Sequence, residues 1–324
     1  MSRSSASPPD EQVAAKLADA LQDALQLMRD AAYAPLRPVL DDVPEAGLLQ
    51  QCLDLCEQHR SRRPEPVRTL HHFACTGGSL ISKCLAALPN VQLLSEVDPL
   101  SVIPLRPGRP IFSPTDMATL LRQSTRGTRQ DLLIELFHRQ ISLVHEDALL
   151  QGQRLLIRDH AHSHFCDGPD VPQRPNFRAL LPGGMTVRSV VTVRHPLESF
   201  AALANNGWIS FEPGTLDDYC RRYILFLDSY ADVPVVHYED FVRHPESTMQ
   251  RLCEILDLRY ESQFTDLYSV FQISGDSGRT GGVISPRASR PEVGRLGGEA
   301  QASQCFLQLV ARLGYGLAPL DTAC

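Results

Sequence analysis

The stretch HHFACTGGSLISKCL, residues 71–85, decides the fold, because a short apolar strand, a glycine turn and a helix follow one another in it. In the turn Thr76-Gly77-Gly78-Ser79, the glycines let the backbone approach a phosphate, and the first N–H groups of a helix that begins near Ser79 point at its charge. Lys83 lies one turn further on, on the same helical face as Ser79. An ordinary glycine turn before a helix explains the motif equally well. The motif GxxxxGK(S/T) is absent, so no lysine paired with a magnesium-binding hydroxyl is implied.

Outward from this stretch, short apolar segments alternate with helical patterns. The runs LLIR, SVVTV and VPVV are continuously apolar, which is typical of parallel strands that helices cover on both faces. Helices are expected to begin at Ser113-Pro114-Thr115-Asp116 and at His244-Pro245-Glu246, where a cap or a first-turn proline precedes an apolar-periodic stretch. The sequence therefore predicts an α/β fold of three layers, with a mostly parallel sheet and helices on both faces. The expected strands are Thr69–Ala74, Val91–Leu94, Arg154–Arg158, Ser189–Val193 and Val233–Tyr238.

The first part of the chain has a different pattern. Apolar residues at helical spacing predict one helix over Glu11–Tyr33 and a second over about Ala46–Gln58. We therefore expect an N-terminal helical extension, residues 1–65, followed by one α/β domain, residues 66–324.

Composition and charge exclude several classes of protein. The 324 residues include 31 basic and 38 acidic ones, giving a net charge of -7, whereas a nucleic-acid backbone demands a broad basic surface. The nine cysteines are scattered without a CxxC pair, as is typical of free thiols in a reducing compartment. No apolar run approaches the length of about 18 residues that a membrane span needs, and the N-terminus lacks the layout of a signal peptide. We therefore expect a cytoplasmic protein without a membrane span or a nucleic-acid partner.

The segment SVVTVRHPLESF, residues 189–200, places Arg194 at the carboxyl end of a buried strand and Pro196 in the first turn of the next helix. In an open α/β sheet, ligands bind at this end of the strands. An arginine there is suited to hold a phosphate. The alternative is a surface arginine that pairs with a carboxylate.

The segment RLLIRDHAHSHF, residues 154–165, places Arg158 and His160 at another strand end, with His162 and His164 following. Histidine can remove a proton from an attacking hydroxyl near neutral pH, so a general base is the first interpretation. A hydrogen-bonded structural histidine is the second, and a zinc site made of the three histidines is the third. Glu96, which follows the strand in LLSEVDP, is a second candidate base at the same edge.

The Gly/Ser/Arg-rich run from Ser274 to Gly298 predicts a long surface loop. A basic loop in an acidic protein is a candidate lid over an anionic ligand, and a solvated loop is the alternative. Its arginines are Arg279, Arg287, Arg290 and Arg295.

Taken in this order, the elements over residues 69–290 resemble the sulfotransferase family that uses 3′-phosphoadenosine 5′-phosphosulfate (PAPS), which has a P-loop NTPase-like fold. The resemblance implies that CTGGSLISK holds the 5′-phosphosulfate, with Lys83 replacing the family's basic residue at the position of Thr76. It implies that His160 is the catalytic base with Arg158 in support, or that Glu96 is the base, as in other branches.

For the 3′-phosphate, the resemblance implies Arg194. The family has a serine eight residues further on; this position is Ala202 here, so Ser199 is its expected substitute. Arg279 is the first expected contact from the loop over Ser274–Gly298, called the late loop below.

The function implied is transfer of a sulfuryl group from PAPS to a hydroxyl or amine of a small-molecule or glycan acceptor. His160 acts as base, PAP is the product and no metal is needed. The rival hypotheses are a nucleotide kinase or NTPase of P-loop type, a catalytically inactive nucleotide-binding protein and, more remotely, a zinc hydrolase.

Overall fold

The computed structural model describes residues 22, 47, 50, 64–103, 113–276 and 283–319. The chain divides into two compact units, Met1–Pro64 and Glu65–Cys324. The first unit is described only at residues 22, 47, 50 and 64, of which the first three are helical. The two helices expected before residue 60 lie otherwise outside the described residues and stay predictions.

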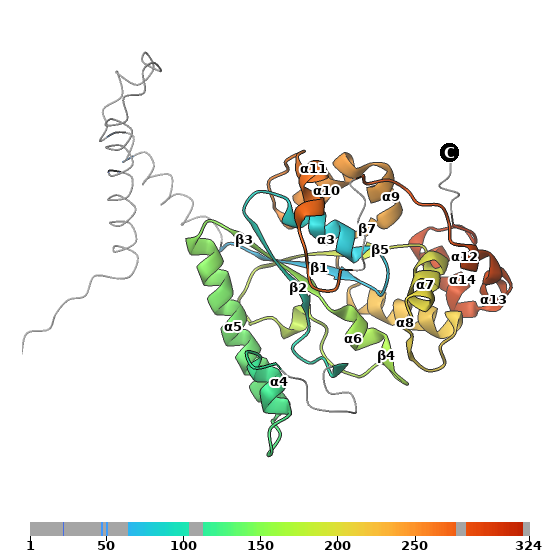
Figure 1. Ribbon diagram of the computed structural model, residues 1–324, viewed down its shortest axis with the longest axis horizontal. Helices are drawn as coiled ribbons and strands as arrows, with labels where there is room; N and C mark the ends of the chain where they lie inside the picture. The colour runs from blue at the N-terminus through green and yellow to red at the C-terminus, as the bar shows by residue number, and fades with distance from the viewer. Residues whose placement is uncertain are drawn as a thin grey trace, which may run out of the picture. The chain divides into compact units, whose positions relative to one another are not determined.

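The second unit is built on a sheet of five parallel strands in the order β2-β3-β1-β5-β7 (Figure 1). All five predicted strands are present, so the predicted parallel α/β fold is confirmed. A separate pair of two-residue strands, β4 and β6, lies outside this sheet. The strands are β1 Val67–His72, β2 Val91–Val97, β3 Arg154–Asp159, β4 Asp167–Gly168, β5 Val187–Val193, β6 Ser210–Phe211 and β7 Val235–His237.

Helices connect and cover the strands. The described α-helices are α3 Gly78–Ala86, α4 Met117–Arg122, α5 Gln130–Leu150, α6 Ala161–Phe165, α7 Pro196–Asn205, α8 Leu216–Ser229, α9 Tyr238–Arg243, α10 Pro245–Leu256, α11 Phe264–Leu267, α12 Pro291–Arg295, α13 Gly297–Ala302 and α14 Gln304–Leu313. Two short 3-10 helices are η2 Arg178–Leu180 and η3 Tyr268–Val270.

Successive strand residues pack on opposite faces of the sheet, which explains why the strand sequences are continuously apolar. Leu70 and Val190 pack with residues of α3, α9 and α10 on one face. Ile157 packs with α5, and Val191 with α8, on the other face. Figure 1 shows α3 and α10 on one side of the sheet and α5 and α8 on the other, which gives the three layers expected.

The strand boundaries differ from the prediction by one to three residues, and two further differences concern a helix cap and the late loop. The cap of α4 is Asp116 rather than Ser113, because the Asp116 carboxylate accepts hydrogen bonds from the N–H groups of Ala118 and Thr119. The late loop is shorter than predicted, since α12 and α13 occupy most of residues 291–302. Among the described residues, no helix combines the length and apolarity that a membrane crossing requires.

Candidate active site

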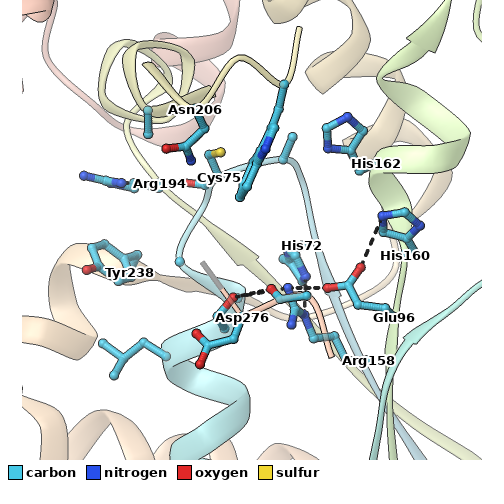
Figure 2. A pocket seen from close by; sticks show the side chains of 18 of the residues that line it. His72, Cys75, Glu96, Arg158, His160, His162, Arg194, Asn206, Tyr238 and Asp276 are labelled. Carbon is cyan, nitrogen blue, oxygen red and sulfur yellow. Dashed lines mark hydrogen bonds and ion pairs between the residues drawn. The ribbon is translucent and has the colours of Figure 1, made fainter. Parts of the chain in front are cut away.

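A cavity of about 430 Å3 opens where β1, β3 and β5 end, at the carboxyl edge of the sheet (Figure 2). This is the edge at which open α/β sheets bind ligands. Residues between His72 and Arg290 meet there, although they are far apart in the sequence. The cavity is lined by His72, Ala74, Cys75, Gly77, Gly78, Ser79, Leu80, Glu96, Ile103, Arg158, His160, His162, Arg194, Ala202, Asn206, Trp208, Tyr238, Gly275, Asp276, Arg287 and Arg290.

The turn between β1 and α3 requires both of its glycines. Gly77 has φ 89°, and a Cβ added there would lie 2.2 Å from the Tyr238 ring. A Cβ at Gly78 would lie 2.4 Å from the His72 ring. Thr76 is buried, and its hydroxyl donates to the Phe73 carbonyl at 2.7 Å, so its side chain does not line the cavity. The backbone of the turn, rather than a side chain at position 76, faces the cavity.

The structure directs Lys83 away from the role implied by the resemblance. Its buried ammonium forms an ion pair with the Asp276 carboxylate and does not line the cavity. The Ser79 hydroxyl lines the cavity and donates to the Gly275 carbonyl at 3.1 Å. Gly275 therefore contacts the first turn of α3, and Asp276 contacts the helix one turn further on.

Arg158, at the end of β3, is a cation beside the glycine turn. Its side chain is buried, and Nη2 lies 2.6 Å from Glu96 Oε1 and 3.4 Å from Ser79 Oγ. Its Nε donates to His72 Nε2 at 2.7 Å. Arg158 thus connects β1, β2, β3 and α3 at one point.

Glu96 reaches the cavity because β2 is irregular. It has φ 64°, and the register of β2 with β3 shifts between Leu94 and Val97. Its Oε2 lies 3.2 Å from His160 Nε2, and Figure 2 shows the carboxylate between His160 and Arg158. Burial raises the pKa of Glu96 to about 7, and the neighbouring Arg158 charge only partly opposes this. Burial also lowers the pKa of His160 below its ordinary value.

The three histidines of the predicted triplet do not converge. The strand ends at Asp159 and α6 follows, so His160 and His162 line the cavity while the buried His164 bonds to the Pro172 carbonyl at 3.2 Å. Burial lowers the pKa of His164 to about 4. The described residues contain no group of three or more side chains able to hold a metal ion together.

Arg194 lines the same cavity as the glycine turn. Its Nη2 lies 3.0 Å from the Glu198 carboxylate, and its guanidinium carbon lies 5.0 Å from the centre of the Tyr238 ring. Ser199 is fully buried and donates to the His195 and Pro196 carbonyls. It therefore does not reach the cavity, and its expected contact with the 3′-phosphate is wrong for this structure. Ala202, at the family's serine position, lines the cavity with a methyl group.

The late loop contributes two arginines to the cavity wall, Arg287 and Arg290. Arg279, the contact implied by the resemblance, lies outside the described residues. Arg295 belongs to α12 and is not part of the cavity lining.

The sequence alone assigned no role to His72, Asn206 or Tyr238, which also line the cavity. His72 precedes the glycine turn by a few residues, and this adjacency was the available signal. Tyr238 is the first residue of α9, and only the packing of α9 against the turn brings it to Gly77.

A parallel sheet with helices on both faces, a glycine turn after its first strand and cations at two further strand ends together define an α/β protein with a candidate anion site at the carboxyl edge of its sheet. Residues 185–262 match the model of the sulfotransferase family. This segment includes Arg194 but not the glycine turn. Over residues 185–262, the resemblance to sulfotransferases that was predicted from the sequence is thereby confirmed.

Solved sulfotransferase structures resemble the chain at low sequence identity. The sulfotransferase domain from the curacin biosynthetic pathway is 14% identical, with 79% of this chain and 100% of that chain covered and a TM-score of 0.46. The sulfotransferase from Alicyclobacillus acidocaldarius is 15% identical, with 78% and 98% covered and a TM-score of 0.42. Mouse sulfotransferase SULT7A1, complexed with PAP, is 10% identical, with 77% and 86% covered and a TM-score of 0.40. Likenesses at these TM-scores do not establish an activity. Among curated proteins, none matches the sequence.

Proposed function

We propose that the protein is a sulfotransferase that moves the sulfuryl group of PAPS to a hydroxyl or amine of a small-molecule or glycan acceptor, leaving PAP. The observation that carries the proposal is that the glycine turn after β1 and Arg194 after β5 line one cavity. A donor with phosphate groups on both sides of its ribose needs two separate anion sites within one cavity. The match of residues 185–262 to the sulfotransferase family supports the same reaction.

The phosphosulfate end is assigned to the glycine turn. The N–H groups of Gly78 and Ser79 belong to the first turn of α3, where a helix offers them no intrahelical acceptor. These donors and the helix dipole stabilise the charge that builds on the leaving phosphate oxygen. Arg158 adds a full positive charge beside Ser79. It is therefore assigned the role of the basic residue at the phosphosulfate end, which the resemblance implied for Lys83.

The opposite end of the donor is assigned to Arg194, with Arg287 and Arg290 on the same wall of the cavity. A guanidinium binds phosphate through two parallel hydrogen bonds, which fixes the orientation of the ligand. Glu198 and Tyr238 hold the Arg194 side chain at the cavity wall before the donor arrives.

The base is assigned to His160. It takes the proton from the acceptor while the acceptor oxygen or nitrogen forms a bond to sulfur and the bond from sulfur to the phosphate oxygen breaks. Its lowered pKa keeps the ring neutral, as a base must be, at pH 7. Glu96, whose carboxylate lies 3.2 Å from the ring, orients His160 and is the alternative base.

Calorimetric titration with PAP, ADP, AMP and ATP tests the donor assignment. We expect PAP to bind at least about tenfold more tightly than ADP or AMP, because each lacks one of the paired phosphate contacts. Binding should not require magnesium. Tighter, magnesium-dependent binding of ATP would instead support a kinase or NTPase, and PAP binding without conversion of PAPS would support an inactive nucleotide-binding protein.

Two matched variants test the base. His160→Ala should lose PAPS-dependent transfer while its Kd for PAP stays within about threefold of wild type, since a base contributes roughly 100-fold or more to rate. Glu96→Ala should retain part of the transfer rate. If His160→Ala keeps full turnover and Glu96→Ala abolishes it, Glu96 is the base.

A further inference from the structure

We propose that His72 is the positioning residue for Arg158: a neutral imidazole that accepts the Arg158 Nε–H and thereby directs the guanidinium into the phosphosulfate side of the cavity. This inference rests on the proposed function. His72 is the last residue of β1, and Arg158 stands on the adjacent strand β3 (Figure 2).

The hydrogen-bond partners of His72 fix its protonation and tautomer. Arg158 Nε, 2.7 Å from His72 Nε2, carries a proton at any relevant pH and can only donate. The Phe73 carbonyl, 3.1 Å from His72 Nδ1, can only accept. Nε2 must therefore be the unprotonated nitrogen and Nδ1 the protonated one, so the ring is neutral.

The charges around His72 favour the same neutral form. Burial and the neighbouring Arg158 guanidinium lower the pKa of His72 well below its ordinary value, and His160 and His71 act in the same direction. A protonated ring would lose the acceptor that holds Arg158 and would place two positive charges side by side.

The bond through Nε determines where the rest of the guanidinium points. A guanidinium is planar, so fixing Nε in the plane also fixes both Nη atoms. Nη2 then faces Glu96 Oε1 and the Ser79 hydroxyl. Nη1 faces the Ser95 hydroxyl at 3.1 Å. The Arg158 charge is thus held beside the first turn of α3, where the leaving phosphate oxygen is placed by the proposed function.

His72 also sets the distance between this arginine and the glycine turn. Its ring lies so close to Gly78 that any Cβ at position 78 would approach the ring to 2.4 Å. The ring therefore contacts the turn on one side and Arg158 on another. A further consequence is that His72, whose Nε2 lone pair is already engaged, does not compete with His160 as the base.

The first test is the NMR spectrum of the imidazole nitrogens in the wild-type protein, with the His72 signals assigned by comparison with His72→Gln. We expect a neutral ring with the proton on Nδ1 at pH 6.5. A cationic ring, or a proton on Nε2, overturns the proposal, whatever reaction the protein catalyses.

The second test compares His72→Leu, which removes the acceptor, with His72→Gln, whose Oε1 can replace Nε2. The readouts are the single-turnover hydrolysis of PAPS to PAP and sulfate, the Kd for PAP and the thermal midpoint. A displacement of Arg158 by about 1 Å should slow hydrolysis by roughly 10- to 100-fold in His72→Leu, with Kd changed less than about threefold. His72→Gln should recover most of the rate.

The control is His138→Leu, which removes a 3.0 Å hydrogen bond to the Leu180 carbonyl between two residues that do not line the cavity, and it should leave hydrolysis unchanged. Wild-type rates in His72→Leu overturn the proposal, as does a parallel loss of PAP binding and thermal stability, which would indicate a merely structural role. Failure of the wild-type protein to bind PAP refutes the proposed function instead, while the NMR test of His72 still applies.

Discussion

Replacing Glu96 with glutamine should stabilise the protein, and increasingly so as the pH rises. The folded protein raises the pKa of Glu96 from 4.5 to about 7, chiefly through burial. A carboxyl with a raised pKa binds its proton more tightly in the folded state, so its favourable contribution is complete below pH 4.5 and is lost as the pH rises through 7. Since one pKa unit corresponds to about 1.4 kcal/mol, the contribution of Glu96 to the free energy of unfolding falls by about 1 kcal/mol between low pH and pH 5, and by about 3 kcal/mol between low pH and pH 8.

Urea unfolding at pH 5 and pH 8 measures this effect. Glu96→Gln cannot ionise and still offers an amide oxygen to Arg158, so the free energy of unfolding should exceed that of wild type by about 1 kcal/mol at pH 5 and about 3 kcal/mol at pH 8. The control is Glu135→Gln, which removes an exposed ion pair with Arg139 on α5 and should change stability by under about 0.5 kcal/mol at both pH values. The reasoning would be refuted if the difference in free energy of unfolding between Glu96→Gln and wild type did not grow from pH 5 to pH 8. It would also be refuted if Glu96→Gln were less stable than wild type at pH 8.

Two further predictions use pairs of matched variants. Arg194→Met should weaken PAP binding by about 10- to 100-fold in calorimetry, because a charged hydrogen-bond partner is worth about 1.5 to 3 kcal/mol. Arg178→Met, which loses only an ion pair with an exposed aspartate, should bind PAP as wild type does, and equal losses in the two variants would remove Arg194 from the site. Gly77→Ala should lower the urea midpoint of unfolding further than Gly127→Ala does. Both glycines have a positive φ, but a Cβ at Gly77 would overlap the Tyr238 ring, whereas a Cβ at Gly127 would have nothing within 4 Å. Equal urea midpoints for the two variants would contradict this prediction, because they would show that the overlap of the added Cβ with Tyr238 does not destabilise the protein.

The sheet could be predicted from the sequence because each strand carries its signal locally. SVVTV and LLIR are apolar on both faces, and the helix after SVVTV begins at a recognisable proline, Pro196. The glycine turn, Arg158, His160 and Arg194 could be selected for the same reason, since each follows such a strand and strand ends share one edge of a parallel sheet.

What could not be predicted depends on contacts between distant segments. Lys83 was expected to face the phosphate, but Asp276, almost two hundred residues later, pairs with it. Ser199 was expected to replace the family's serine at the position of Ala202, but the orientation of α7 buries Ser199 and brings Ala202 to the cavity. His72 has no distinguishing sequence pattern, because its importance comes from Arg158 on a neighbouring strand.

The central claim is that the glycine turn and Arg194 hold opposite ends of one donor, and a crystal structure of the protein with PAP bound tests it most directly. We predict the 5′-phosphate within hydrogen-bond distance of the N–H groups of Gly78 and Ser79, and the 3′-phosphate in contact with the Arg194 guanidinium. PAP bound outside this cavity, or with either phosphate away from its assigned group, would contradict the claim.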